Sequence, residues 1–286
     1  MKRKYPHVTI VILNWNGLQD TRECLRSLEK LNYPQYDIIV VDNDSGQDEA
    51  GGLERIFGDK IKIIRNIRNL GYAGGNNTAL KYILRKQLAR YTLLLNNDTT
   101  VEPNLLLELV QKAEEDNSIG SIGPDIRLYD RRDKSQIKRY GLLKELTEVD
   151  TLSGACLLLR NSALEICGLF DTIFFLYCED EDLHARLRKG GFKVKYLPSR
   201  AKVYHKVENS SRKVSGLQAY HMTRNRFLLV RRYMMNLKGL RKMSFDNCQS
   251  LVREMVVYKN WRSLPSFISG FKDGLLLFIQ NPAPKF

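Results

Sequence analysis

Apolar runs alternate with amphipathic segments along the first two hundred residues of the chain. Continuous apolar runs at 8–13, 37–42, 61–66 and 91–98 predict buried strands. Apolar residues at helical spacing predict helices at 18–31, about 76–87 and 103–116. Further strands are expected at 151–160, 193–197 and 201–205, with a helix at 162–167. This order predicts an α/β fold, with a mainly parallel sheet flanked by helices on both faces.

The pattern changes after residue 215, where it becomes helical to the end of the chain. The charge is also unevenly distributed. Residues 200–286 hold 17 Lys+Arg against 4 Asp+Glu, whereas the first 199 residues hold 29 and 28. We therefore expect a domain at 1–214 and a basic, amphipathic, helical region at 215–286. Such a region favours an anionic partner.

The segment 128–150 is highly charged and has few apolar anchors. This composition predicts an excursion that passes over a site.

Length and composition narrow the class of protein. At 286 residues and 43% apolar composition, the chain can bury a large core. Its five cysteines are odd in number and form no CxxC pair, which favours a reducing compartment and argues against a zinc ribbon. No apolar stretch reaches the ~18 residues of a membrane-spanning helix.

Polar side chains follow three of the predicted strands. Ligands bind at the carboxyl ends of strands in open α/β sheets, so these side chains are candidates for a common site. They are Asn14, Trp15, Asn16, Asp42, Asn43, Asn96, Asn97 and Asp98. A glycine turn, "NLGYAGGNN", follows the third strand and permits close approach of a ligand to the backbone. It matches neither GxGxxG nor a P-loop, so dinucleotide and ATP motifs are not supported.

Two residues are candidate metal ligands. Asp98 follows a strand of leucines, where a carboxylate can ligate a hard cation that bridges a diphosphate. His205 ends the predicted strand at 201–205 and can complete such a site.

Four consecutive acids, Glu179, Asp180, Glu181 and Asp182, open a predicted helix. Acids at a helix start can simply cap exposed N–H groups and interact with the helix dipole. They can also form a catalytic cluster. The residues at this position alone leave both interpretations open.

The chain resembles the family 2 glycosyltransferases, whose fold is called GT-A. The resemblance rests on seven segments that occur in the family's order between Val8 and His205. They are "VTIVILNWNG", "VVDNDSGQ", "NLGYAGGNN", "LLLNNDT", "LSGACLLLR", "GLFDTIFFLYCEDEDLHARLRKGG" and "VYH". The most similar subgroup contains rhamnosyltransferases and related enzymes of envelope-polysaccharide synthesis.

The resemblance implies a nucleotide pocket. Its residues would be Leu13, Asn14, Trp15, Asn16, Asp42, Asn43, Asn69, Gly71, Asn76, Asn77 and Asn97. Asp42 would accept a hydrogen bond from the N3–H of the base, which uracil and thymine share. The donor is therefore expected to be a UDP- or dTDP-sugar.

The resemblance also implies an inverting transfer. Asp180 would be the general base, and Glu179 would orient the site or form a hydrogen bond with the acceptor. Asp98, the remaining carboxylate of the family's DxD motif, and His205 would hold Mn²⁺ or Mg²⁺. Asp182 would contact the acceptor or cap the helix, and Arg224 would lie near the diphosphate or acceptor.

The basic C-terminal region and the resemblance together suggest the remaining partners. We expect a glycan or lipid-linked acceptor. We also expect the protein to be cytoplasmic and bound peripherally to an anionic membrane surface.

Three other functions are less well supported by the residues. A sugar nucleotidyltransferase would need a glycine-rich loop with Arg or Lys after the first strand, and "NWNG" offers none. A glycosidase would leave the nucleotide features unused. Nucleic acid is not expected, because the aromatics of this region sit with aliphatic residues. The sequence leaves the oligomeric state open.

Overall fold

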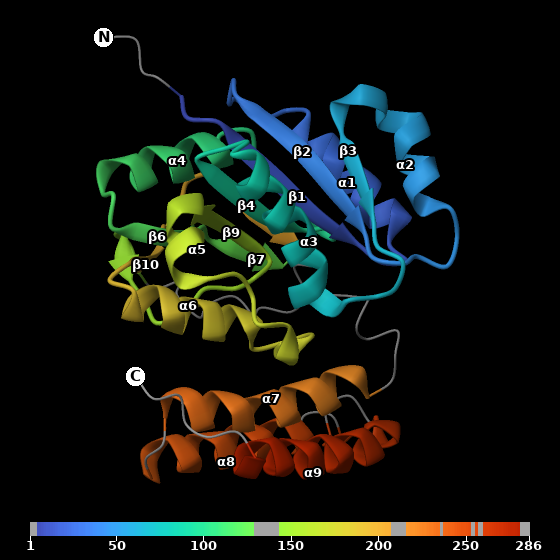
Figure 1. Cartoon of the computed structure of the whole chain (residues 1–286), viewed down its shortest axis with the longest axis vertical. Helices are drawn as coiled ribbons and strands as arrows, with labels where there is room; N and C mark the ends of the chain where they lie inside the picture. Colours follow the sequence, from blue (N-terminus) through green and yellow to red (C-terminus); the bar gives the residue numbers. More distant parts are fainter. Residues whose placement is uncertain are drawn as a thin grey trace.

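The computed structural model describes residues 5–128, 143–206, 216–234, 237–252, 255–256 and 260–280. Figure 1 shows a central sheet flanked by helices, with three C-terminal helices on one side of it. The expected α/β class is confirmed. Most of the charged segment 128–150 lies outside the described residues, so its expected position over the site stays a prediction.

Eight strands form the main sheet, in the order β3 (Lys62–Arg65), β2 (Tyr36–Asp42), β1 (Val8–Asn14), β4 (Tyr91–Asn96), β9 (Cys156–Arg160), β6 (Ile119–Gly123), β10 (Lys193–Tyr196) and β8 (Thr147–Glu148). Four of the seven neighbouring pairs in this described sheet are parallel. A smaller sheet contains β5 (Thr99–Val101), β11 (Val203–His205) and β7 (Ile126–Leu128).

The alternation of side chains in β1 divides the core into two layers. Ile10 and Ile12 pack on one face of the sheet, and Val11 packs on the other. The first face is covered by α1 (Leu18–Leu28), α2 (Glu49–Phe57) and α4 (Leu105–Glu115). The second is covered by α3 (Gly71–Lys86), α5 (Asn161–Cys167) and α6 (Glu179–Lys189). The expectation of helices on both faces is therefore confirmed.

Helix α3 begins five residues earlier than expected, so the glycine segment is not a separate turn. Gly71 starts the helix at φ +70°, and Gly75 already lies inside it. A Cβ atom on Gly75 would lie 2.5 Å from Cδ1 of Leu13. The glycines thus let α3 approach β1 closely, which places the helix start beside the strand end. Helix α2 and strands β5, β6, β7 and β8 were not predicted from the sequence pattern.

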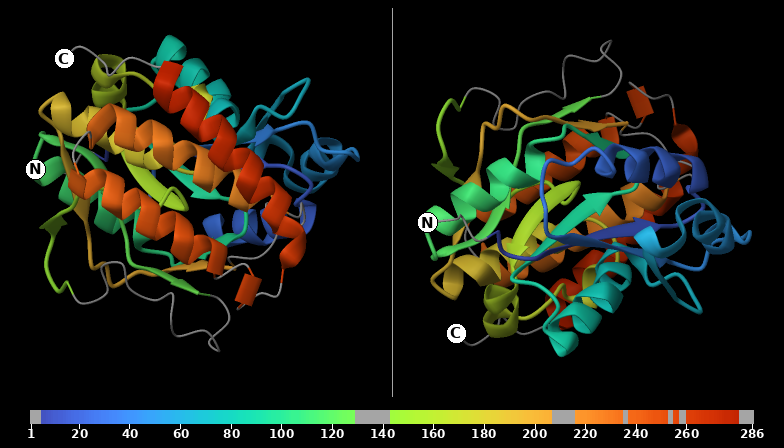
Figure 2. Two further views of the ribbon diagram at one scale, coloured as in Figure 1. Left: turned by 90° about the horizontal axis from the view of Figure 1, so that it is seen from below. Right: turned by 90° about the horizontal axis from the view of Figure 1, so that it is seen from above.

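The C-terminal region forms α7 (Leu217–Tyr233), α8 (Leu237–Val252) and α9 (Leu264–Gln280). In Figure 1, α7 lies between the main sheet with its helices and the other two C-terminal helices. Seen from below, α7 lies between α8 and α9 (Figure 2). Every residue of α7 is buried or half-buried. Within the described residues, no helix combines the length and the apolarity needed to cross a bilayer. The expected domain boundary at 214 falls in 207–215, outside the described residues, and stays a prediction.

Candidate active site

The ends of β1, β2 and β4 lie side by side, as expected from the sequence. Asn14 pairs with Asp42 in the β1–β2 register, and Leu13 pairs with Asn96 in the β1–β4 register. The polar residues at these strand ends therefore share one edge of the sheet. This edge is the candidate active site.

The side-chain amide of Asn14 forms its hydrogen bonds within the protein interior. It is fully buried, and its Nδ2 donates to Oδ1 of Asp42 at 3.2 Å and to Oε2 of Glu49 at 2.8 Å. Its Oδ1 accepts from Thr21 Oγ1 at 2.6 Å. Asn14 therefore fixes the carboxylate of Asp42 rather than offering its own amide to a ligand. Glu49, in the helix that was not predicted, is a partner that sequence reasoning missed.

The loops after β1 and β2 are tied together at their tips. Oδ1 of Asn16 accepts from the N–H of Gly46 at 2.7 Å, and the N–H of Asn16 donates to Ser45 Oγ at 3.1 Å. Asn16 adopts φ +51°, a conformation that asparagine tolerates. Asn16 is exposed, while Leu13 and Trp15 are half-buried. These three residues thus remain available to line a pocket.

A second group forms around Asn43 and the start of α3. Nδ2 of Asn43 donates to Oδ1 of Asn69 at 2.9 Å and to the carbonyl oxygen of Gly71 at 3.1 Å. The structure therefore brings Asn43, Asn69 and Gly71 together. Asn76 and Asn77 bond elsewhere: Asn76 donates to the carbonyl of Tyr72, and Asn77 exchanges two hydrogen bonds with the backbone of Phe170. These contacts do not support a direct ligand role for either amide.

Asp98 and His205 meet at the junction of the two sheets. Nε2 of His205 lies 3.0 Å from Oδ1 of Asp98, and both side chains are 18% exposed. The pairing of Thr99 with His205 in the β5–β11 register holds them together. A carboxylate and an imidazole suit Mn²⁺, which accepts both oxygen and nitrogen ligands. Among the described residues no group of three acidic, His or Cys side chains could hold a metal, so ligand oxygens and water would supply the other positions.

Asn97 points away from this pair. Its Nδ2 donates to Thr21 Oγ1 at 3.1 Å, and the residue is buried against α1. A side-chain role for Asn97 in nucleotide binding has no support in these contacts.

The four acids at the start of α6 separate into different environments. Oδ2 of Asp180 accepts from the N–H of Gly154 at 3.1 Å, and the residue is half-buried. Glu179 is 6% exposed, and its Oε2 has no hydrogen-bond partner among the described residues. Burial, and then the adjacent carboxylate of Asp180, raises the pKa of Glu179 well above its usual range.

Asp182 is fully buried and faces α7. It accepts from Arg186 Nε at 2.9 Å, from Arg232 Nη1 at 2.8 Å and from the hydroxyl of Tyr233 at 2.7 Å. These contacts do not support the expected acceptor contact, because no face of the carboxylate is open. The residue instead anchors α6 to α7 of the C-terminal region.

Arg224 is also engaged by the protein. Its Nη1 donates to the carbonyl oxygen of Ile173 at 2.8 Å and to Oδ1 of Asn225 at 2.7 Å. Asn225, fully buried, donates in turn to the carbonyls of Phe174, Leu176 and Tyr177. The pair therefore supports the turn before α6. Sequence reasoning noticed this pair and placed it near the ligand instead.

The segment before β9 connects the two acidic positions. The N–H of Gly154 binds Asp180, and the carbonyl of the next residue, Ala155, accepts from the N–H of Asn96 at 3.0 Å. Asn96 is two residues from Asp98. Asp180 and Asp98 are thus joined through two backbone contacts at one sheet edge. Gly154 is a further candidate site residue, which the sequence analysis placed only within the strand expected at 151–160 and within one family segment.

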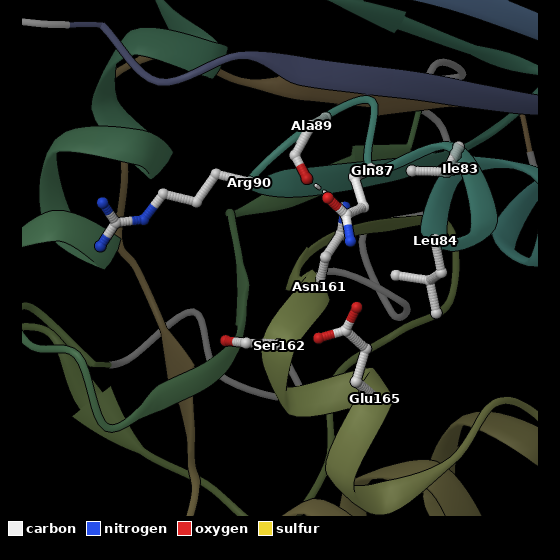
Figure 3. Close-up of a pocket in the computed structure, with 8 residues that line it drawn as sticks. All are labelled: Ile83, Leu84, Gln87, Ala89, Arg90, Asn161, Ser162 and Glu165. Carbon is white, nitrogen blue, oxygen red and sulfur yellow. Dashed lines mark hydrogen bonds between the residues drawn. The ribbon is translucent and has the colours of Figure 1, made fainter.

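A pocket at the opposite end of the strands is unrelated to this edge (Figure 3). It lies before β4 and after β9, and is lined by Ile83, Leu84, Gln87, Ala89, Arg90, Asn161, Ser162 and Glu165. None of these residues is a predicted site residue.

Two proteins of similar sequence are named as glycosyltransferases. The hexosyltransferase Agl10 of low-salt glycan biosynthesis in Haloferax volcanii is 25% identical, over 97% of this chain and 92% of its own. A Mycobacterium tuberculosis N-acetylglucosaminyl-diphospho-decaprenol L-rhamnosyltransferase is 43% identical over 84 residues, which are 29% of this chain and 27% of the relative.

Solved structures share the fold. Staphylococcus aureus TarS 1–349, crystallised with UDP-GlcNAc, superposes with a TM-score of 0.65 at 17% identity, over 94% of this chain and 80% of TarS. The mannosyltransferase PcManGT from Pyrobaculum calidifontis, with GDP-Man and Mn²⁺, gives 0.64 at 15% identity, over 97% and 88%. The expected GT-A fold is confirmed.

Residues 9–167, more than half of the chain, match the family described as Glycosyl transferase family 2. The chain therefore belongs to glycosyl transferase family 2 and is a glycosyltransferase that uses a sugar-nucleotide donor.

Proposed function

We propose that this glycosyltransferase inverts the anomeric carbon as it moves a sugar from a UDP- or dTDP-sugar to a hydroxyl of a glycan or lipid-linked acceptor. The observation that carries the proposal is the hydrogen bond of Asp180 to Gly154 N–H. It holds a half-buried carboxylate at the sheet edge where the nucleotide is expected. A relative named for a diphospho-decaprenol acceptor supports the lipid-linked alternative.

Asp180 acts as the general base. A sugar hydroxyl is a poor nucleophile at neutral pH, and a carboxylate within hydrogen-bond reach takes its proton as it attacks the anomeric carbon. Attack opposite to the nucleotide inverts that carbon in one step. The N–H groups of Gly154 and Glu181 donate to Oδ2 and Oδ1 of Asp180, at 3.1 and 2.8 Å, so the carboxyl plane is fixed before the acceptor arrives. Glu179, whose pKa is raised by burial, places a group able to donate a hydrogen bond beside this base.

The donor is held at the neighbouring strand ends. Asp42, fixed by Asn14 and Ser45, is the expected acceptor for the base N3–H. Asp98 and His205 would hold a divalent cation, which supplies charge neutralisation for the departing diphosphate. A solved neighbour bound to Mn²⁺ and a nucleotide sugar supports this assignment.

A screen of nucleotide sugars tests the proposal. Purified protein is incubated with each UDP- and dTDP-sugar and Mn²⁺ or Mg²⁺, and release of the nucleoside diphosphate is measured. Asp180→Asn should lower turnover on the best donor by about 10²-fold or more while nucleotide affinity persists. Glu181→Gln is the matched control and should stay within about threefold. Unchanged turnover in Asp180→Asn would remove Asp180 from the role of base, and release of pyrophosphate from a nucleoside triphosphate and sugar phosphate would indicate a nucleotidyltransferase.

A further inference from the structure

Helix α9 presents an apolar stripe to solvent. Ile268, Phe271, Leu275, Leu276 and Ile279 repeat at helical spacing, and they are 59%, 46%, 42%, 45% and 68% exposed. No described residue of the chain covers them to the extent expected for a core position. A contiguous exposed apolar face of this kind marks an interaction surface.

The orientation of this stripe is fixed by the opposite face of the helix. Gly270 and Gly274 are buried there against α7. A Cβ atom at Gly270 would lie 2.4 Å from the carbonyl oxygen of Tyr220, and one at Gly274 would lie 2.5 Å from a ring carbon of Phe227. Rotating α9 to bury its apolar stripe would bring larger side chains into this close contact. The stripe therefore cannot turn inward.

Helix α8 and the residues just before α9 also expose apolar side chains. Phe245 and Val252 of α8 are 66% and 57% exposed, and Trp261, just before α9, is 63% exposed. From below, α8 and α9 lie on either side of α7 and cover this end of the molecule (Figure 2). The α8–α9 face, defined as the exposed residues of 240–252 and 261–280, is thus broad rather than a pocket for one side chain.

All charged side chains on this face are basic. The described, exposed charged residues are Arg241, Lys242, Arg262 and Lys272. The two acids nearby, Asp246 and Asp273, are half-buried, and Asp273 accepts from the hydroxyl of Tyr220 at 2.7 Å. Apolar side chains flanked by cations complement an anionic lipid surface, where acyl chains lie beneath phosphate groups. A second copy of the chain would bring like charges together instead.

We propose that the α8–α9 face docks on an anionic bilayer, with the apolar stripe of α9 in the headgroup region and the basic residues on the lipid phosphates. Docking of this kind does not require a membrane-spanning helix. Through α7, which binds both α9 and the turn before α6, the docked face is coupled to the active site. Presentation of a lipid-linked acceptor in this way rests on the proposed function, whereas docking itself does not.

Vesicle flotation without donor or acceptor tests the docking separately from activity. The full chain is mixed with vesicles of phosphatidylcholine alone or with about 30% phosphatidylglycerol. Binding is expected to the anionic vesicles and to weaken between low and high salt. The triple variant Ile268→Ser/Leu276→Ser/Ile279→Ser should reduce the partition coefficient by at least about tenfold. The control Ile56→Ser/Ile67→Ser/Ile166→Ser replaces three exposed residues elsewhere and should leave it unchanged.

A second pair of variants tests the charges. Arg262→Gln/Lys272→Gln should weaken binding about fivefold for each residue removed, while Lys81→Gln/Lys86→Gln, exposed on α3, should not. Absence of binding by the wild type, or equal binding by the stripe variant and its control, overturns the proposal. Light scattering identifies the other occupant: a dimer that the stripe variant converts to a monomer, without vesicle binding, assigns the face to a second copy.

Discussion

Nδ2 of Asn225 in α7 donates a hydrogen bond of 2.7 Å to the carbonyl oxygen of Tyr177, two residues before Glu179. The same amide reaches the carbonyls of Phe174 and Leu176. Phe175, Tyr177 and Cys178 all adopt positive φ in this turn, which is unfavourable for residues with side chains. The turn that aims Asp180 is therefore stabilised from the C-terminal helices.

Asn225→Ala should lower turnover more than it lowers nucleotide affinity. The substitution removes three hydrogen bonds to carbonyl groups of the turn before α6, at a cost of about 1–3 kcal/mol, and relaxes that turn. Donor hydrolysis, nucleotide binding and thermal unfolding should be measured together. Thr223→Val is the control, because Thr223 is equally buried in α7 and its hydroxyl lacks a partner among the described residues. A loss of stability with unchanged turnover would show that Asn225 has only a structural role.

Removal of either expected metal ligand should weaken metal-dependent nucleotide binding. Asp98→Ala or His205→Ala leaves one protein ligand, so the Mn²⁺ concentration needed for half-maximal UDP binding should rise by about tenfold or more. Calorimetric titration with and without EDTA provides the measurement. Asp59→Asn, on the exposed 3₁₀ turn after α2, is the control. Equal UDP affinity of the wild type with and without EDTA would contradict the assignment.

Acidification should destabilise the fold through His184. This ring is fully buried: its Nδ1 accepts from the N–H of Leu152 and its Nε2 lies 3.0 Å from Ser121 Oγ. Burial, followed by Arg188, lowers the pKa of His184 to about 3. The unfolded chain binds this proton near pH 6.5, so the stabilisation is complete above that pH and is lost as pH falls toward 3. The slope for this single group is about 1.4 kcal/mol per pH unit.

Urea denaturation at pH 7.5, 6 and 5 would measure this dependence. His184→Gln can donate and accept in the same directions without titrating, so its stability should fall less steeply. His7→Gln, at a half-buried position, serves as the control. A slope in His184→Gln equal to that of the wild type would assign the effect to other groups.

Gly71→Ala should be more damaging than the same change at Gly191. Both glycines have positive φ, +70° and +83°, so alanine pays a similar backbone cost of about 1–2 kcal/mol at each. At Gly71 the new Cβ would also lie 2.4 Å from the carbonyl oxygen of Phe175, whereas nothing lies within 4 Å at Gly191. The unfolding temperature and the UDP affinity should therefore both be lower in Gly71→Ala than in Gly191→Ala. Equal unfolding temperatures for the two variants would show that the start of α3 can move away from the backbone at Phe175 without loss of stability.

The sequence predicts β1, β2, β3, β4 and β9, because these buried strands appear as apolar runs, but it misses the short strands β5, β7 and β8 and the glycine-containing β6. It misplaces the start of α3, because glycines suggest a turn, whereas here they serve close packing on Leu13. It cannot assign the direction of a polar side chain whose partner lies far along the chain. Asn14 bonds to Glu49 and Asp182 bonds to Arg232, and neither pairing leaves a local signal.

The bond between Arg232 and Asp182 has a consequence for recombining this enzyme with its relatives. The family match ends at residue 167, yet the helix that carries Asp180 begins at Glu179. That helix is held through Asp182 by Arg232 of α7, which begins at Leu217. A chimera that exchanged only the matched portion would take the proposed nucleotide-binding residues from one parent and the helix that carries Asp180, the proposed general base, from the other. A graft that carries residues 9–234 as one block should transfer donor preference and retain turnover, because the Arg232–Asp182 bond then comes from a single parent.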